Sequence, residues 1–151
     1  MCCCVPLLVI AWGVAGCGVT VPTDPQGTLE RVRDGVLQAG ASASGELVTI
    51  DGSEVGGTLA EIVEEFAQSV DARVEWTVGS EEDLVDGLES GDLDVAIGGM
   101  TDATPWSDRV SVTRAYDTIP GSHGPVVLLV PLGENAWQAE LEGYLDREVA
   151  Q

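Results

Sequence analysis

The feature that most constrains the fold is the alternation of two apolar patterns between residues 35 and 97. Short apolar segments typical of strands alternate with longer segments whose apolar residues recur at helical spacing. Strands and helices in this order are joined by right-handed crossovers, which makes the sheet parallel. We therefore predict an α/β fold of three layers, a mainly parallel sheet flanked by helices; an α+β fold of another topology is the alternative. The predicted strands are 35–41, 72–78 and 93–97, and the predicted helices are 58–70 and 80–91.

Other signals place the ends of the helices and extend the pattern. Thr58 and Glu61 form a capping-box pattern before the first helix, and Gly91 suits the C-terminal end of the second. The apolar run 125–131 is predicted as a further strand, and Asn135 as the cap of a last helix. The last helix has an apolar stripe that we expect to be buried, made of Trp137, Leu141, Tyr144 and Leu145.

The first 16 residues, MCCCVPLLVIAWGVAG, are apolar and uncharged, and small residues precede Cys17. This run is too short to span a membrane and resembles a lipoprotein signal peptide with its lipobox. The resemblance implies cleavage before Cys17, acylation of its thiol, and a protein that is lipid-anchored on the extracytoplasmic face of the cell membrane. The usual positive residues are absent, because the first Lys or Arg is Arg31. The alternative is a short buried helix with incidental cysteines.

The chain then divides into three predicted regions: the signal peptide 1–16, a lipid anchor and tether at 17–27, and a globular lobe at 28–151. The tether is rich in Pro, Gly and Thr, which favours an extended linker. All cysteines other than Cys17 would leave with the signal peptide. The lobe therefore has no cysteine, which excludes a disulfide framework and a structural zinc site there.

The charge of the chain limits its partners. The sequence has 26 acidic residues and 6 basic ones, all of them arginine, for a formal net charge of −20. Nucleic acids and anionic lipid surfaces repel such a chain, so we expect no nucleic-acid partner. The apolar fraction of 44% is too high for a disordered chain, and a packed core is expected.

In open parallel sheets, ligands bind beyond the carboxyl ends of the strands, where the loops diverge. Three segments follow predicted strands: 42–44, 79–80 and 98–106. The third, GGMTDATPW, combines residue types that suit a small polar organic ligand. By itself such a Gly-Gly segment is more often only a turn.

Individual residues of these segments have distinct uses. Gly98 and Gly99 leave backbone N–H groups open to close approach, and Thr101 offers a hydroxyl. Trp106 offers a flat apolar wall. Ser44 is the candidate from the loop after the first strand.

From about residue 29 to residue 116, the chain resembles the first lobe of a family 3 extracellular solute-binding protein, which has the type 2 periplasmic-binding fold. The resemblance lies in the segments GVLQAGAS, GTLAEIVEEF and LVDGLESGDLDVAIGGMT and in Tyr116, with a returning strand and closing helix in PVVLLVPLGENAWQAELEGYL. It implies a single solute-binding-like lobe over residues 28–151. In that family, the segment corresponding to Gly99, Met100 and Thr101 binds the ligand through main-chain amides and the threonine hydroxyl.

Two departures from the family pattern affect the expected ligand. An ungapped count places Trp106 where amino-acid binders have the arginine that holds the ligand carboxylate, so we expect aromatic stacking in its place. Only residues 117–124 separate Tyr116 from the returning strand, where the family inserts a second lobe. A lone lobe covers one side of a ligand, so weak binding is expected unless a second binding lobe or another partner covers the other side.

The predicted function is a lipid-anchored extracytoplasmic solute-binding protein that captures a small polar solute, amino-acid-like or an amine. The resemblance implies delivery to a membrane transporter permease of the ABC type. The alternative is a ligand-free interaction module that docks on a membrane transporter or sensor. We expect no enzyme, no cofactor and no metal site, because His123 is the only histidine and the chain has neither a P-loop nor a G-x-S-x-G motif.

Overall fold

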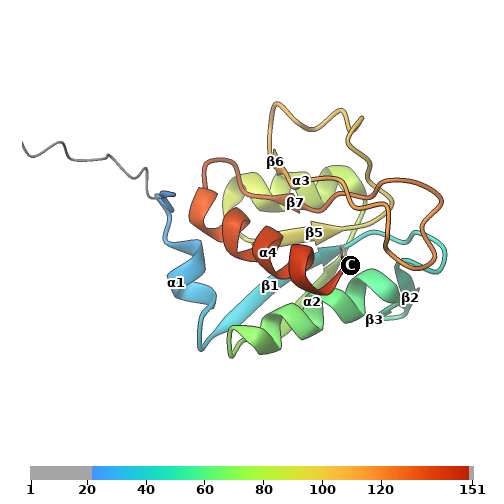
Figure 1. Cartoon of the computed structure of the whole chain (residues 1–151), viewed down its shortest axis with the longest axis horizontal. Coiled ribbons are helices and arrows are strands. Elements are labelled where there is room, and N and C mark those ends of the chain that lie inside the picture. Colours follow the sequence, from blue (N-terminus) through green and yellow to red (C-terminus); the bar gives the residue numbers. More distant parts are fainter. Residues whose placement is uncertain (1–21, 150–151) are drawn as a thin grey trace, which may run out of the picture.

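The computed structural model describes residues 22–149, which form an α/β structure with helices on both sides of a five-stranded sheet (Figure 1). The fold class predicted from the sequence is confirmed. The predicted signal peptide, 1–16, and the predicted lipidation site, Cys17, lie outside the described residues. In chain order the elements are α1 (Thr28–Val32), β1 (Val36–Ala41), β2 (Thr49–Asp51), β3 (Glu54–Gly56), α2 (Thr58–Ser69), β4 (Arg73–Val78), α3 (Glu81–Ser90), β5 (Val95–Ile97), β6 (Ser111–Val112), β7 (Leu129–Val130) and α4 (Asn135–Glu148).

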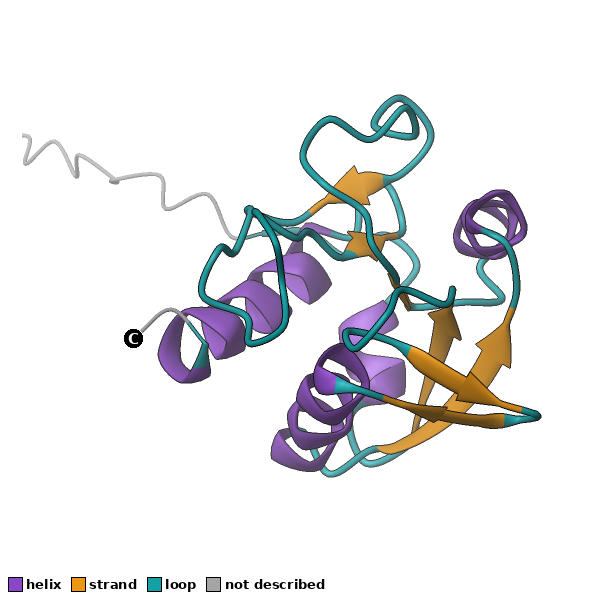
Figure 2. Ribbon diagram, turned by 90° about the vertical axis from the view of Figure 1, so that its right-hand side faces the viewer, coloured by secondary structure: helices purple, strands orange, loops and turns teal. Residues whose placement is uncertain are grey.

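The sheet has the strand order β4-β1-β5-β7-β6. Figure 2 shows helices on both sides of its strands. Strand β1 lies between β4 and β5 and is parallel to both, and its pairing with β4 covers its whole length. Strand β7 pairs antiparallel with β5 and with β6, while β2 and β3 form a separate hairpin. The carboxyl ends of β1 and β5 are therefore neighbours at one end of the sheet.

Different helices cover the two faces of the sheet. Helices α2 and α4 pack on one face, where the ring of Phe66 lies with its centroid 5.4 Å from those of both Trp137 and Tyr144. Helix α3 covers the other face through a smaller cluster that includes Leu84 and Leu88. Within residues 22–149 no helix is long and apolar enough to cross a membrane. The stripe predicted for the last helix is buried as expected: Trp137, Leu141, Tyr144 and Leu145.

The capping box predicted from Thr58 and Glu61 does not form at the start of α2. Thr58 is the first helical residue, and the N-cap is Gly57, which has no side chain to cap with. Two backbone carbonyls of the loop between β1 and β2 accept N–H groups of the first helical turn instead. The carbonyl of Glu46 accepts from Thr58 at 3.3 Å, and the carbonyl of Leu47 accepts from Leu59 at 2.9 Å. A tertiary contact therefore replaces the local side-chain cap.

Helices α3 and α4 begin in different ways. Ser80 and Asp83 form a reciprocal capping box at α3. At α4 the predicted cap, Asn135, is already helical, and its N–H donates to the carbonyl of Thr23 at 2.9 Å. The prediction for Asn135 is wrong because the chain before α1 supplies the acceptor.

Two carboxylates tie the starts of α1 and α4 together. Glu134, which is 1% exposed, accepts the backbone N–H groups of Gln26 at 2.9 Å and Thr28 at 3.1 Å. Asp24 accepts one backbone N–H from the start of each helix, at 2.6 and 3.2 Å. Burial opposes the ionisation of Glu134, but the hydrogen bonds outweigh it and lower its pKa. Part of the segment predicted as a tether is thus held against α4.

The apolar run 125–131 is buried but only partly a regular strand. Strand β7 has two residues, while Val126 forms an isolated bridge with Tyr116. The N–H of Val127 donates to the carbonyl of Met100 at 3.1 Å. Residues of this run therefore pair with different segments in turn, which leaves only a short regular strand. The pairing also places the run beside the segment that follows β5.

Candidate functional site

Two loops meet beyond the carboxyl ends of β1 and β5. The loop after β1 folds back through a bridge between Ser44 and Val48. The loop after β5 begins with Gly98 and Gly99. A Cβ atom at Gly99 would lie 2.6 Å from Ser44 Oγ, so glycine is what allows the two loops to come this close. Ser44 and Gly99, both predicted from the sequence, are brought together because their strands are neighbours.

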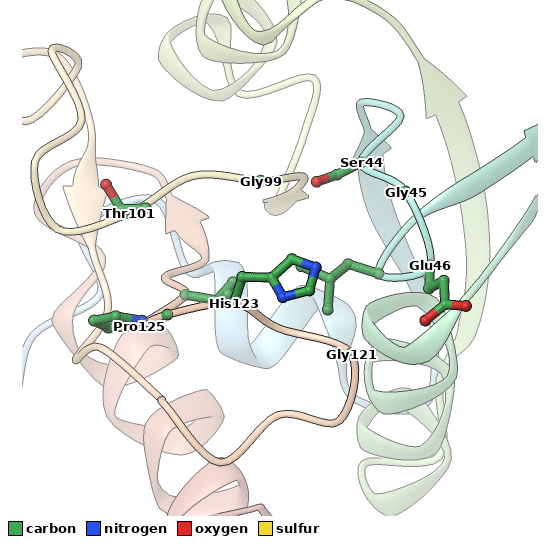
Figure 3. Close-up of a pocket in the computed structure, with 11 residues that line it drawn as sticks. Ser44, Gly45, Glu46, Gly99, Thr101, Gly121, His123 and Pro125 are labelled. Atoms are coloured by element: carbon green, nitrogen blue, oxygen red, sulfur yellow. The ribbon is translucent and has the colours of Figure 1, made fainter.

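A pocket of about 540 Å³ opens beside this contact (Figure 3). Its volume lies within the range of small-molecule sites, roughly 300–1,000 Å³. Three of the predicted ligand-binding residues line it: Ser44, Gly99 and Thr101. The complete lining is Ser44, Gly45, Glu46, Leu47, Gly99, Thr101, Gly121, His123, Gly124, Pro125 and Val126.

The wall opposite the two loops is formed by residues 121–126, which sequence reasoning did not select. His123 lies across the pocket between Thr101 and Glu46 in the view of Figure 3. The sequence predicts His123 as a solvated loop residue, and it is exposed as well as pocket-lining. No motif marks this segment. The signal that could have found it is its position just before the buried run that returns beside β5.

Tyr116 fixes the start of this wall. Its backbone exchanges hydrogen bonds with Val126, at 2.8 and 2.9 Å, and its hydroxyl donates to Asp146 of α4 at 3.1 Å. Burial is the main cause that raises the pKa of Tyr116 to about 12, so the hydroxyl stays protonated and keeps its role as donor at neutral pH. The segment 117–125 is thus held at both ends by one bridge.

Met100, the fourth predicted residue, does not line the pocket with its side chain. That side chain is 3% exposed and belongs to the cluster under α3. Its carbonyl is already used by Val127. Met100 therefore positions the segment between Gly99 and Thr101 and packs into the core.

Trp106, the fifth predicted residue, lies apart from this pocket. Its ring is partly buried against the cluster under α3, and Nε1 donates to Glu81 Oε2 at 3.3 Å. The guanidinium carbon of Arg109 lies 5.7 Å from the ring centroid. These contacts hold the indole against α3, so it supplies no stacking wall to the pocket at Ser44. The loop leads Trp106 away because residues 101–109 turn back toward α3.

Within the described part of the chain, the pocket is lined by one acidic residue and one histidine, and by no arginine. Glu46 and His123 are its only titratable lining residues among those described, and none of the six arginines, all within residues 22–149, lines it. The described residues contain no group of three or more His, Cys, Asp or Glu side chains placed to hold a metal ion. The arrangement can therefore hold a small polar molecule through hydroxyls, backbone groups and one carboxylate.

The sequence matches no protein-family model and no curated relative. Solved structures do match. Domain 1 of TmArgBP in its arginine-bound form superposes with a TM-score of 0.68 and 20% sequence identity, over 78% of this chain and 97% of that one. The fold is that of a single lobe of a periplasmic-binding protein.

Longer proteins match over a smaller share of their length. A truncated, arginine-bound ArgBP from T. maritima gives a TM-score of 0.51 at 22% identity, over 58% of this chain and 42% of that one. An ancestral cyclohexadienyl dehydratase gives 0.51 at 20% identity, over 58% and 37%. The shared feature is the fold, which both binding proteins and an enzyme use.

Proposed function

We propose that this chain is a solute-binding lobe that captures a small polar solute, amino-acid-like or an amine, without covalent chemistry. The observation that carries the proposal is the pocket beyond the carboxyl ends of β1 and β5, where Ser44, Gly99 and Thr101 converge. This is the place where open parallel sheets bind ligands. The hydroxyls and glycine backbone would orient the solute.

A single lobe is sufficient for this role. Domain 1 of TmArgBP is one domain and is described in an arginine-bound form, which supports ligand binding by a lobe of this size. In the present chain, the segment with Gly121, His123 and Pro125 adds a wall to the pocket. Such an open pocket buries less of a ligand than a closed cleft, so we expect affinities in the micromolar to millimolar range.

The location and the partner belong to the same proposal. Cys17 would carry the lipid that anchors the protein on the extracytoplasmic face of the cell membrane, and a transporter permease would receive the solute. The support is the apolar N-terminal run with small residues before Cys17. The contacts of Asp24 and Glu134 would then hold the lobe close to its anchor.

The proposal is tested by thermal unfolding of the purified protein with a panel of amino acids and amines at millimolar concentration. A ligand that binds only the folded state raises the free energy of unfolding, by about 2.7 kcal/mol at a hundred times its Kd. We expect a dose-dependent shift with at least one member, and NMR of that mixture should show the ligand chemically unchanged. Flat melting curves across the panel would contradict capture and favour the interaction module.

A further inference from the structure

The pocket presents a carboxylate and hydroxyls, and none of its described lining residues is an arginine or lysine; its one basic side chain is the imidazole of His123. Glu46 places a carboxylate at its edge, beside the loop of Gly121, and Ser44 adds a hydroxyl oxygen (Figure 3). Thr101 also lines the pocket, but its hydroxyl oxygen accepts the backbone N–H of Ala103 at 3.4 Å. The chain as a whole carries a net charge of −20. Both the local and the overall field therefore attract cations and repel anions.

The arginines are committed elsewhere in the fold. Arg109, for example, lies between Asp86 and Glu89 of α3, and Arg31 pairs with the buried Asp94 at 2.6 Å. Five of the six arginines are held in ion pairs that a carboxylate clamp in the pocket would have to break. Ion pairs or other interactions engage all six: Arg31, Arg33, Arg73, Arg109, Arg114 and Arg147.

The helix N-termini at this end of the sheet are also partly paired with protein groups. At α2, the carbonyls of Glu46 and Leu47 accept the first backbone N–H groups. At α3, Ser80 and Asp83 cap the first turn. A helix N-terminus is the usual substitute for a cationic side chain in anion binding, and at both of these helices protein groups already accept part of the first-turn N–H groups.

A ligand carboxylate would therefore lose its hydration with no arginine, lysine or fully open helix N-terminus to replace it, and with the His123 imidazole as its only basic neighbour among the described residues. An ammonium or guanidinium group, by contrast, would meet the carboxylate of Glu46 and the hydroxyl of Ser44. The loss of hydration by an unpaired charge is among the most costly events in binding. The pocket should thus distinguish ligands by the presence of a carboxylate more than by their length.

We propose that this pocket is selective for organic amines and guanidines that lack a carboxylate, and that it discriminates against the corresponding α-amino acids. The proposal rests on the solute-binding function proposed above and names its ligand class. Glu46 is its specificity-determining residue.

The test uses pairs of probes that differ only by the carboxylate: agmatine with arginine, and putrescine with ornithine. Isothermal titration calorimetry with the full-length protein in detergent should show each amine binding at least about tenfold more tightly than its amino acid. Equal or tighter binding of the amino acids overturns the selectivity while leaving solute binding intact. Absence of binding by these probes and by the whole amino-acid and amine panel overturns the proposed function itself.

A charge-neutral variant tests the role of Glu46. Glu46→Gln should weaken agmatine binding about two- to fivefold, the effect expected for one partly solvated ion pair. Glu54→Gln on the exposed hairpin strand β3 removes the same charge away from the pocket and should leave the affinity unchanged. Equal effects of the two variants would overturn the assignment of Glu46, because only the overall charge would then matter.

Discussion

Substitution of Gly57 by alanine should damage both the fold and the pocket, because this residue links helix α2 to the loop that lines the pocket. Gly57 has φ 95° and ψ 171°, a conformation that is essentially restricted to glycine. A Cβ atom there would lie 2.7 Å from the carbonyl oxygen of Leu47 and 2.8 Å from that of Glu46. Both contacts are with backbone, which cannot rotate away as a side chain could.

The magnitude follows from two separate costs. Holding alanine in this backbone region costs about 1–3 kcal/mol. Relieving the overlap with the loop costs about 1–3 kcal/mol more, by analogy with overpacked cores. We therefore expect Gly57→Ala to lower the free energy of unfolding by about 2–6 kcal/mol, and to weaken ligand binding, since Glu46 and Leu47 must move.

Urea unfolding followed by circular dichroism measures the loss, and Gly133→Ala provides the matched control. Gly133 has a similar positive φ of 88°, but a Cβ atom there would meet nothing within 4 Å. Its replacement should cost only the backbone term, about 1–3 kcal/mol. If the two variants lose the same stability, the backbone overlap at Gly57 contributes nothing and the reasoning is refuted.

Three further predictions concern stability, the pocket and the anchor. Glu134→Gln should destabilise the protein at pH 7 by about 1.5–3 kcal/mol, because it replaces a charged acceptor of two backbone N–H groups. Folding lowers the pKa of Glu134, so its carboxylate contributes stability above the unfolded pKa of about 4.3 and loses that contribution as the pH falls through the folded pKa. The difference in unfolding free energy between wild type and Glu134→Gln, measured by urea melts, should therefore shrink at low pH. A difference that stays constant with pH would contradict this role of the Glu134 charge. Ser44→Ala should reduce the affinity for any captured solute about fivefold in calorimetry while Ser53→Ala, in the exposed hairpin, leaves it unchanged; equal affinities would remove Ser44 from the site. Cys17→Ala should abolish incorporation of labelled palmitate and release the protein from the membrane fraction, and retention of the label would place the lipid elsewhere.

The regular elements could be predicted because their signals are local. The spacing of apolar residues predicted the central helices and strands. Gly91 ends α3 in the left-handed conformation, as expected of a glycine at the C-terminal end of a helix. The ends of other helices were less predictable. Thr58 and Asn135 have the residue types of caps, but backbone carbonyls from distant segments reach those N–H groups first.

The candidate site was predictable only in part, for a similar reason. Ser44, Gly99 and Thr101 follow strands that a parallel sheet places side by side, so topology alone brings them to one end. Whether Trp106 reaches the same place depends on the path of a loop, which its contacts with Glu81 and α3 decide. Sequence spacing carries no information about such a path.

The sequence by itself determined the layered α/β fold, the strand ends that carry ligand-binding residues, and the negative charge, because each depends on residue type and short-range order. Only the tertiary structure decided which polar residues face a common space. It placed Glu46 and His123 at the pocket and directed Trp106 and the arginines to α3 and other partners. The physical reason is that loop paths follow from long-range packing and hydrogen bonding, which residues distant in the sequence supply together.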